Sequence, residues 1–145
     1  MKRFVQYLLV PSVFLLATGC AQTLEATKAP GTDLSKLKTF YVQKLQADER
    51  GIEQLIARHL TGMGFTATSG ASETPSSPVD ALVTYQDKWM WDITMYMLEL
   101  SVQLRDPRNQ MVLATGHSMR TSLVRESPEG MVKEVFMEIF KGEKP

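Results

Sequence analysis

The chain of 145 residues contains a single cysteine, Cys20, and two histidines, His59 and His117. One cysteine excludes an internal disulfide, and two isolated histidines offer no recognisable spacing for a metal site. The chain has no excess of either charge, with 16 basic and 16 acidic residues. Removing Lys2 and Arg3 from the 16 basic residues leaves 14 basic against 16 acidic residues, and this balance gives no electrostatic case for nucleic-acid binding, which needs a basic face. We therefore expect no metal, no cofactor and no nucleic-acid partner.

The sequence also lacks an apolar run long enough to cross a membrane. Apolar residues dominate positions 4–17, whereas a spanning helix needs about 20 consecutive apolar residues. Lys2 and Arg3 precede this run, and small residues follow it. A basic start, a short apolar core and a small-residue end are typical of a secretory signal. We predict that residues 1–19 form a signal peptide.

This leader ends in Leu16-Ala17-Thr18-Gly19-Cys20, which resembles the lipobox of bacterial lipoproteins. The resemblance implies cleavage between Gly19 and Cys20, and attachment of a diacylglycerol and a fatty acid to Cys20. Two or more acyl chains hold a protein firmly on a bilayer. Ala21 stands where an aspartate would signal inner-membrane retention, so the resemblance implies an outer-membrane lipoprotein that faces the periplasm. The alternative is an ordinary secretory signal with an incidental cysteine.

Small and polar residues dominate positions 21–35, and Pro30-Gly31 is a turn signal among them. This composition predicts that residues 20–36 comprise the lipidated cysteine and a flexible tether. About 15 flexible residues span roughly 20 to 25 Å on average. The remaining residues, 37–145, suffice for one small domain with its own core.

Strand and helix signals alternate along this domain. β-Branched and aromatic residues at 37–42 predict a first strand, and apolar residues recur at helical spacing from 52 to 63. Four further strands are predicted at 65–68, 81–93, 96–104 and 111–122. Gly116 in the last of them indicates close approach of a helix. Ser127 and Pro128 provide a helix start before a second apolar stripe. The order β-α-β-β-β-β-α predicts an α/β domain of the α+β type, with a mostly antiparallel five-stranded sheet and two helices on one face.

The two longest predicted strands form a hairpin that turns within residues 92–95. Apolar residues occupy odd positions in its first strand and even positions in its second, so both sets face one core only if paired numbers have an odd sum. Trp91 then lies opposite Tyr96. Asp87 points inward opposite Leu100, where an ionised carboxylate is costly unless a bulge or an edge position relieves it.

Met90, Met95 and Met97 fall on the parity opposite to the predicted core of this hairpin. Methionine side chains make adaptable contact surfaces. We predict that this uncovered sheet face, with Lys88 and Glu99 beside it, binds a partner protein or a lipid. The alternatives are dispersed surface methionines or burial of the face by the tether.

The segment Val79-Asp80-Ala81-Leu82-Val83-Thr84-Tyr85 resembles the Ala-Asp-x-x-Val-x-Tyr signature of a family of small bacterial envelope lipoproteins that share a domain of unknown function. Lys38-Thr39-Phe40 and Leu113-Ala114-Thr115-Gly116 also resemble that family, although Ala114 stands where the family often has tryptophan. The resemblance implies an α/β domain on a lipid anchor, without established catalytic residues. The order of elements is also similar to that of the lipoprotein partner of the lipopolysaccharide transport barrel.

No set of residues in the sequence forms a recognisable catalytic group. His117 and Ser118 would point to opposite faces of a strand, so they cannot act as base and nucleophile. Asp87 is the candidate for a perturbed acid. We predict a non-catalytic binding or accessory subunit of a cell-envelope complex, held by its lipid anchor beside an envelope protein partner, with its oligomeric state left open. The alternatives are a ligand or lipid carrier in envelope transport, an enzyme of unknown reaction, or a structural tether between membrane and wall.

Overall fold

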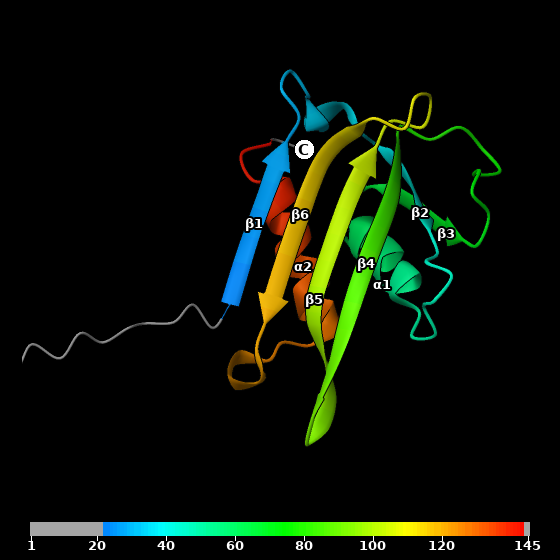
Figure 1. Ribbon diagram of the computed structural model, residues 1–145. Helices are drawn as coiled ribbons and strands as arrows, with labels where there is room; N and C mark the ends of the chain where they lie inside the picture. Colours follow the sequence, from blue (N-terminus) through cyan, green and yellow to red (C-terminus); the bar gives the residue numbers. More distant parts are fainter. Residues whose placement is uncertain (1–21, 144–145) are drawn as a thin grey trace, which may run out of the picture.

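The computed structural model describes residues 22–143 (Figure 1). The predicted signal peptide with Gly19, and the predicted lipidation residue Cys20, lie outside the described residues. The strands are β1 (Gln22–Lys28), β2 (Thr39–Gln43), β3 (Thr66–Gly70), β4 (Ala81–Asp92), β5 (Thr94–Arg105) and β6 (Val112–Arg120). The α-helices are α1 (Ile52–Gly62) and α2 (Pro128–Ile139), and two short 3-10 helices are η1 (Leu34–Lys36) and η2 (Ser122–Val124).

The strands form one mixed six-stranded sheet in the order β1-β6-β5-β4-β2-β3. The neighbours β1, β6, β5 and β4 are antiparallel, whereas β2 runs parallel to both β4 and β3. Figure 1 shows both α-helices on the same face of the sheet. The predicted α+β class with two helices is confirmed, but the sheet has one strand more than predicted and is mixed. The parallel pairing of β2 with β3 follows from α1, which lies between them in the chain, because parallel neighbours need such a crossover connection.

The additional strand, β1, lies in the segment for which composition predicts a flexible tether. It pairs along its whole length with β6, starting with Gln22 opposite Arg120. The prediction of a flexible tether is therefore wrong for residues 22–28. The sequence signal for a strand is weak, because Leu24 and Ala26 are its only apolar residues and only Ala26 packs against the core. An edge strand of this composition shows no clear alternation. The folded domain therefore already includes Gln22.

The core lies between the two helices and the sheet face that they cover. The buried stripes of the helices are Ile52, Ile56 and Leu60 in α1, and Met131, Val132, Val135, Phe136 and Ile139 in α2. They pack on inward residues of the sheet such as Phe40, Val83 and Leu104. Gly116 lets α2 approach β6, because a Cβ there would lie 2.7 Å from Val135 Cγ1. The predicted close approach at Gly116 is confirmed.

The β4–β5 hairpin contains a bulge next to the inward aspartate, where the sequence left a bulge or an edge position open. From Leu82 to Lys88 the paired residue numbers have an odd sum, and Asp87 lies opposite Leu100. The register then shifts by one residue, because Leu98 has no partner on β4. The bulge bends the hairpin just after Asp87, and pairing continues beyond it in the shifted register.

The bulge also reverses the faces of the β5 residues that precede it. Met97 pairs with Trp89, and Trp91 pairs with Met95 rather than with Tyr96. The predicted pairing of Trp91 with Tyr96 is therefore wrong. A shift of one residue moves every following side chain to the other face of a sheet. Sequence alternation alone could not reveal this change.

Candidate functional site

The three methionines that were predicted to bind a partner do not share one surface. Met97 is 1% exposed and belongs to the core, whereas Met90 and Met95 are 42% and 45% exposed. Cross-strand pairing places Met95 with Trp91 on one face of the hairpin, and Met90 with Tyr96 on the other. The prediction is wrong for Met97 because the bulge turns that side chain inward.

Exposed apolar residues gather instead at the tip of the hairpin. Trp91 is 67% exposed and Ile93 is 85% exposed. Ile93 forms the turn with a left-handed φ of 63°, which is costly for a β-branched side chain. Between Trp89 and Leu98, Asp92 is the single charged residue. A two-stranded ribbon buries little by itself, so these side chains meet solvent.

Arg125 ties the segment after β6 to the turn of this hairpin. Its guanidinium donates to Thr94 Oγ1 at 2.6 Å and to the backbone oxygen of Asp92 at 2.5 Å, and it forms an ion pair with the Asp92 carboxylate at 3.3 Å. It also lies 4.4 Å from the centre of the Tyr96 ring, a cation–π contact. The neighbouring 3-10 helix η2 carries Leu123, which is 88% exposed. The apolar end of the molecule comprises Met90, Trp91, Ile93, Met95 and Leu123.

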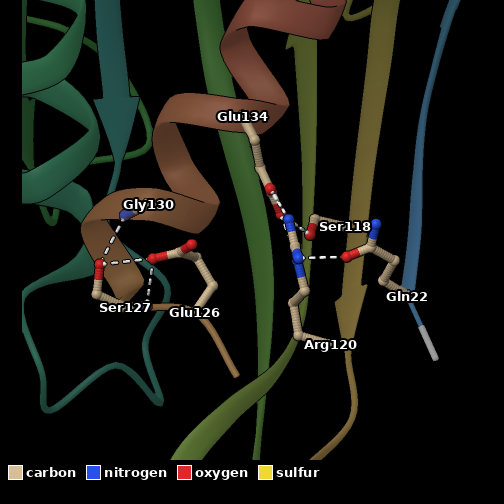
Figure 2. A network of polar contacts seen from close by, with 7 residues as sticks. All are labelled: Gln22, Ser118, Arg120, Glu126, Ser127, Gly130 and Glu134. Carbon is tan, nitrogen blue, oxygen red and sulfur yellow. Dashed lines mark hydrogen bonds and ion pairs between the residues drawn. The ribbon is translucent and has the colours of Figure 1, made fainter. Parts of the chain in front are cut away.

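A second network holds the start of β1 against α2 (Figure 2). Arg120, the last residue of β6, donates to Gln22 Oε1 and forms an ion pair with Glu134 of α2. Ser118 is fully buried and donates to the same Glu134 carboxylate. Hydrogen bonds to Glu134 raise the pKa of the Arg120 guanidinium above its usual value. The network therefore fixes Gln22 relative to α2 through charge-assisted hydrogen bonds.

Sequence alternation does not predict the apolar end as a group. Alternation assigned Trp91 and Ile93 to the core face, but Figure 1 shows the hairpin extending beyond the helices that would cover them. A detectable signal was present in the ten residues from Trp89 to Leu98, which carry one charge around a predicted turn. Such a run predicts more apolar surface than a narrow ribbon can bury.

A buried acid lies at the start of α1. Asp48 is 4% exposed, and its carboxylate accepts hydrogen bonds from the Tyr85 hydroxyl at 2.7 Å and from the amides of Arg50 and Ile52, each at 2.7 Å. Burial would raise the pKa of Asp48, but the hydrogen bonds from Tyr85, Arg50 and Ile52 outweigh it and lower this pKa to about 2. Burial, with the bond to Asp48, raises the pKa of the Tyr85 hydroxyl above its usual value. An acid held ionised beside a phenol held protonated therefore fixes the turn that leads into α1, because it accepts the backbone amides of Arg50 and Ile52.

Asp87, the predicted candidate for a perturbed acid, is half-buried on β4. Its carboxylate accepts a hydrogen bond from Trp89 Nε1 at 2.5 Å. Asp87 stays in the regular register opposite Leu100, because the shift lies between Lys88 and Trp89, so this hydrogen bond offsets part of the cost of its inward position. Its partner is thus an indole from its own strand, which suits a structural role for this carboxylate.

The two histidines lie on different elements and do not meet. His59, on α1, packs 5.8 Å from the Phe136 ring, and burial together with the nearby Lys133 lowers its pKa. His117, on β6, lies 3.7 Å from a Glu99 oxygen on the face without helices, while Ser118 points to α2, as predicted. Among residues 22–143, no group of three or more histidine, cysteine, aspartate or glutamate side chains could hold a metal ion. Within the same part of the chain, no helix is long and apolar enough to span a membrane.

An apolar hollow of about 330 Å³ lies beside η1 and the C-terminal end of α2. Its lining includes Leu34, Met63, Phe65, Met137 and Phe140. Small-molecule sites are typically apolar hollows of about 300 to 1,000 Å³. The hollow therefore has the size and lining for a small apolar ligand.

No family model and no curated protein matches this chain. Its fold resembles two crystal structures of PelC dodecamers from Paraburkholderia phytofirmans. One has a TM-score of 0.56 and 12% identity, and covers 86% of this chain and 99% of PelC. The other, a PelC variant, has a TM-score of 0.56 and 14% identity, and covers 82% and 94%. TolB from Acinetobacter baumannii matches with a TM-score of 0.46 and 20% identity over 83% of this chain and 31% of TolB. At these identities, the likeness to PelC shows a shared fold.

Proposed function

We propose that this protein is a lipid-anchored subunit of a cell-envelope assembly that acts by binding rather than by catalysis. The Leu16 to Cys20 motif and the resemblance to small envelope lipoproteins suggest the anchor. The observation that carries the proposal is the start of β1 at Gln22, two residues after Cys20. Two residues of chain reach at most about 7 Å, so acyl chains on Cys20 would hold the sheet itself at the bilayer. An outer membrane, with the domain facing the periplasm, is the site that the motif favours.

Integration of β1 into the sheet supports this anchoring mode. Arg120 of β6 donates a hydrogen bond to Gln22 and forms an ion pair with Glu134 of α2 (Figure 2). These contacts connect the start of β1 to the helix that covers the core. A flexible tether would let the domain turn freely, whereas this short link restricts its orientation. A fixed orientation favours a role in an ordered assembly.

The partner that we propose is a further copy of the same chain. PelC, which shares the fold, forms a dodecamer. In the described part of this chain, β1 and β3 are the two edges of the sheet, and each pairs on one side only. Unpaired edges offer backbone groups for contact with a neighbouring molecule. Association through two different edges is head-to-tail, and such contacts close into rings when the rotation fits.

A ligand or lipid carrier is the second candidate, and the apolar hollow lined by Met63, Phe65 and Phe140 favours it. A carrier would release a bound lipid or hydrophobic small molecule when the purified protein is extracted with organic solvent. Mass spectrometry of that extract distinguishes the two functions, because an assembly subunit needs no such ligand.

The anchor can be tested on one tryptic peptide. Cleavage after Lys28 releases Cys20–Lys28 from a processed chain, and we expect this peptide to carry the mass of a diacylglycerol and a fatty acid. The Cys20→Ser variant should yield no acylated peptide. An unmodified peptide, or a leader still joined to Cys20 in the wild-type protein, would overturn the proposed function. Light scattering of the detergent-extracted protein measures self-assembly, and a monomer at all concentrations would contradict it.

A further inference from the structure

We infer that the apolar end, formed by the β4–β5 hairpin and η2, rests in the interfacial layer of the bilayer to which Cys20 is anchored. The inference rests on the proposed function, because it uses the position of that anchor. Trp91 and Ile93 would enter the boundary between headgroups and acyl chains. Peripheral proteins bury apolar side chains about 5 to 10 Å into this layer.

Strand pairing places the anchor and the apolar end at the same end of the sheet. Gln22 pairs with Arg120 at the end of β6, and the preceding Met119 pairs with Glu99 of β5. The five β5 residues before Glu99 extend past this level to the turn, which corresponds to roughly 15 Å of strand. Figure 1 shows the hairpin projecting beyond the start of β1. A bilayer reached by an anchor two residues before Gln22 is therefore also within reach of the hairpin tip.

The chemistry of this end suits a bilayer interface. Trp91 and Ile93 expose two large apolar side chains to water, and Leu123 adds a third on η2, which Arg125 links to the hairpin turn. Asp92, the single charged residue between Trp89 and Leu98, is paired with Arg125. Tryptophan is enriched at membrane interfaces, because its ring is apolar and its N–H remains able to bond with the headgroup layer. Burial in the interface would offset the cost of this exposure.

Exposed apolar residues elsewhere on the described surface do not form such a group. Met111 is 64% exposed in the β5–β6 turn at the opposite end of the sheet, and Met137 is 59% exposed on α2. Isolated exposed apolar residues are normal on soluble domains. The concentration of Trp91, Ile93 and Leu123 at the anchored end is what favours a lipid surface over a protein partner.

Two sets of side-chain contacts fix the hairpin turn and the start of β1 to the rest of the domain. Arg125 binds the hairpin turn to η2, and Arg120 binds the start of β1 to α2. Once acyl chains hold Gln22 near the bilayer, the hairpin meets the same bilayer at a high effective concentration. Two contacts at one end hold the strands upright on the membrane. The edges β1 and β3 then face sideways, toward neighbouring copies in the same membrane.

Quenching by brominated lipids tests the inference on the acylated full-length protein. The protein is reconstituted in phosphatidylethanolamine–phosphatidylglycerol vesicles whose acyl chains carry bromine. Trp89→Phe leaves Trp91 as the only tryptophan, and we expect its emission to fall about twofold, since bromine quenches indoles within the interfacial layer. Trp91→Phe is the matched control, because it leaves Trp89, which stacks on Arg50 and bonds to Asp87. Equal quenching of the two variants overturns the inference.

A second measurement avoids any change at Trp89. Ile93→Cys introduces a free thiol while Cys20 is acylated, and a spin label there should collide more with dissolved oxygen than with a water-soluble nickel complex. Met111→Cys is the matched control at the far end of the sheet, where the nickel complex should collide more. Labels that behave alike at the two positions contradict membrane contact.

The outcomes separate the two proposals. An acylated Cys20–Lys28 peptide with unquenched Trp91 overturns only the hairpin inference. An unmodified peptide overturns the proposed anchor and the inference with it. In a third outcome, bromine does not quench Trp91, but its emission maximum shifts as the protein density in the vesicles rises. This result identifies a second copy on the hairpin and also overturns the inference.

Discussion

The Arg120 guanidinium pairs with the Glu134 carboxylate and joins the last residue of β6 to α2. The two side chains are only 18% and 16% exposed, and Ser118 and Gln22 complete the network (Figure 2). We expect Arg120→Ala to lower the free energy of unfolding by about 2 kcal/mol, because it leaves a mostly buried carboxylate without its cation. Urea denaturation measures this loss.

The matched control for this prediction is Arg108→Ala. Arg108 pairs with Asp106 in the turn after β5, and its side chain is 87% exposed. An exposed pair contributes about 0 to 1 kcal/mol, so we expect a change of less than about 0.5 kcal/mol. Equal losses for Arg120→Ala and Arg108→Ala would contradict a structural role for the network.

Met97 and Met90 test the effect of the bulge. Met97→Ala should lower the free energy of unfolding by about 2 to 5 kcal/mol, because it removes a core side chain and leaves a cavity. Met90→Ala should change it by less than about 0.5 kcal/mol, because Met90 is 42% exposed. Thermal or urea unfolding distinguishes the two. Similar values would mean that Met97 does not face the core.

Gly116 tests the contact between α2 and β6. We expect Gly116→Ala to lower the free energy of unfolding by about 1 to 3 kcal/mol, because the new Cβ would lie 2.7 Å from Val135 and 2.8 Å from Ile139. Gly62→Ala, at the end of α1 with open space around it, is the control and should raise stability by roughly 0.5 kcal/mol. A neutral Gly116→Ala would show that α2 can move away without cost.

Asp48 predicts an acid-dependent loss of stability. Its folded-state pKa of about 2 lies below the usual 3.8, so ionised Asp48 stabilises the fold above about pH 4 and this stabilisation is lost as the pH falls toward 2. The shift corresponds to about 2 kcal/mol. Asp48→Asn should therefore be less stable at pH 7 and should lose less stability between pH 4 and pH 2. Glu73→Gln, at an exposed loop carboxylate, is the control. Parallel pH profiles for Asp48→Asn and the wild type would refute the assignment.

Much of the local structure could be predicted from short sequence patterns. Ser127 and Pro128 start α2, with the Ser127 hydroxyl accepting from the Gly130 amide at 3.0 Å. Asp87, an acid on the core parity of its strand, indicated either a bulge or an edge position, and a bulge lies beside it. These predictions succeeded because each depends on neighbours along the chain. The candidate site was predicted less well, because Met90 and Met95 proved to be exposed but Met97 did not.

The sequence by itself determined the periodicity of the helices and long strands, the helix starts, and the leader motif whose processing stays a prediction. The tertiary structure decided that residues 22–28 pair with β6, that β2 and β3 run parallel, and that Gln22, Arg120 and the hairpin tip share one end of the sheet. The reason is physical: local periodicity reports which side chains alternate, whereas strand pairing joins residues far apart in the chain, such as Gln22 and Arg120. A one-residue shift in that pairing exchanges buried and exposed faces without leaving a local trace.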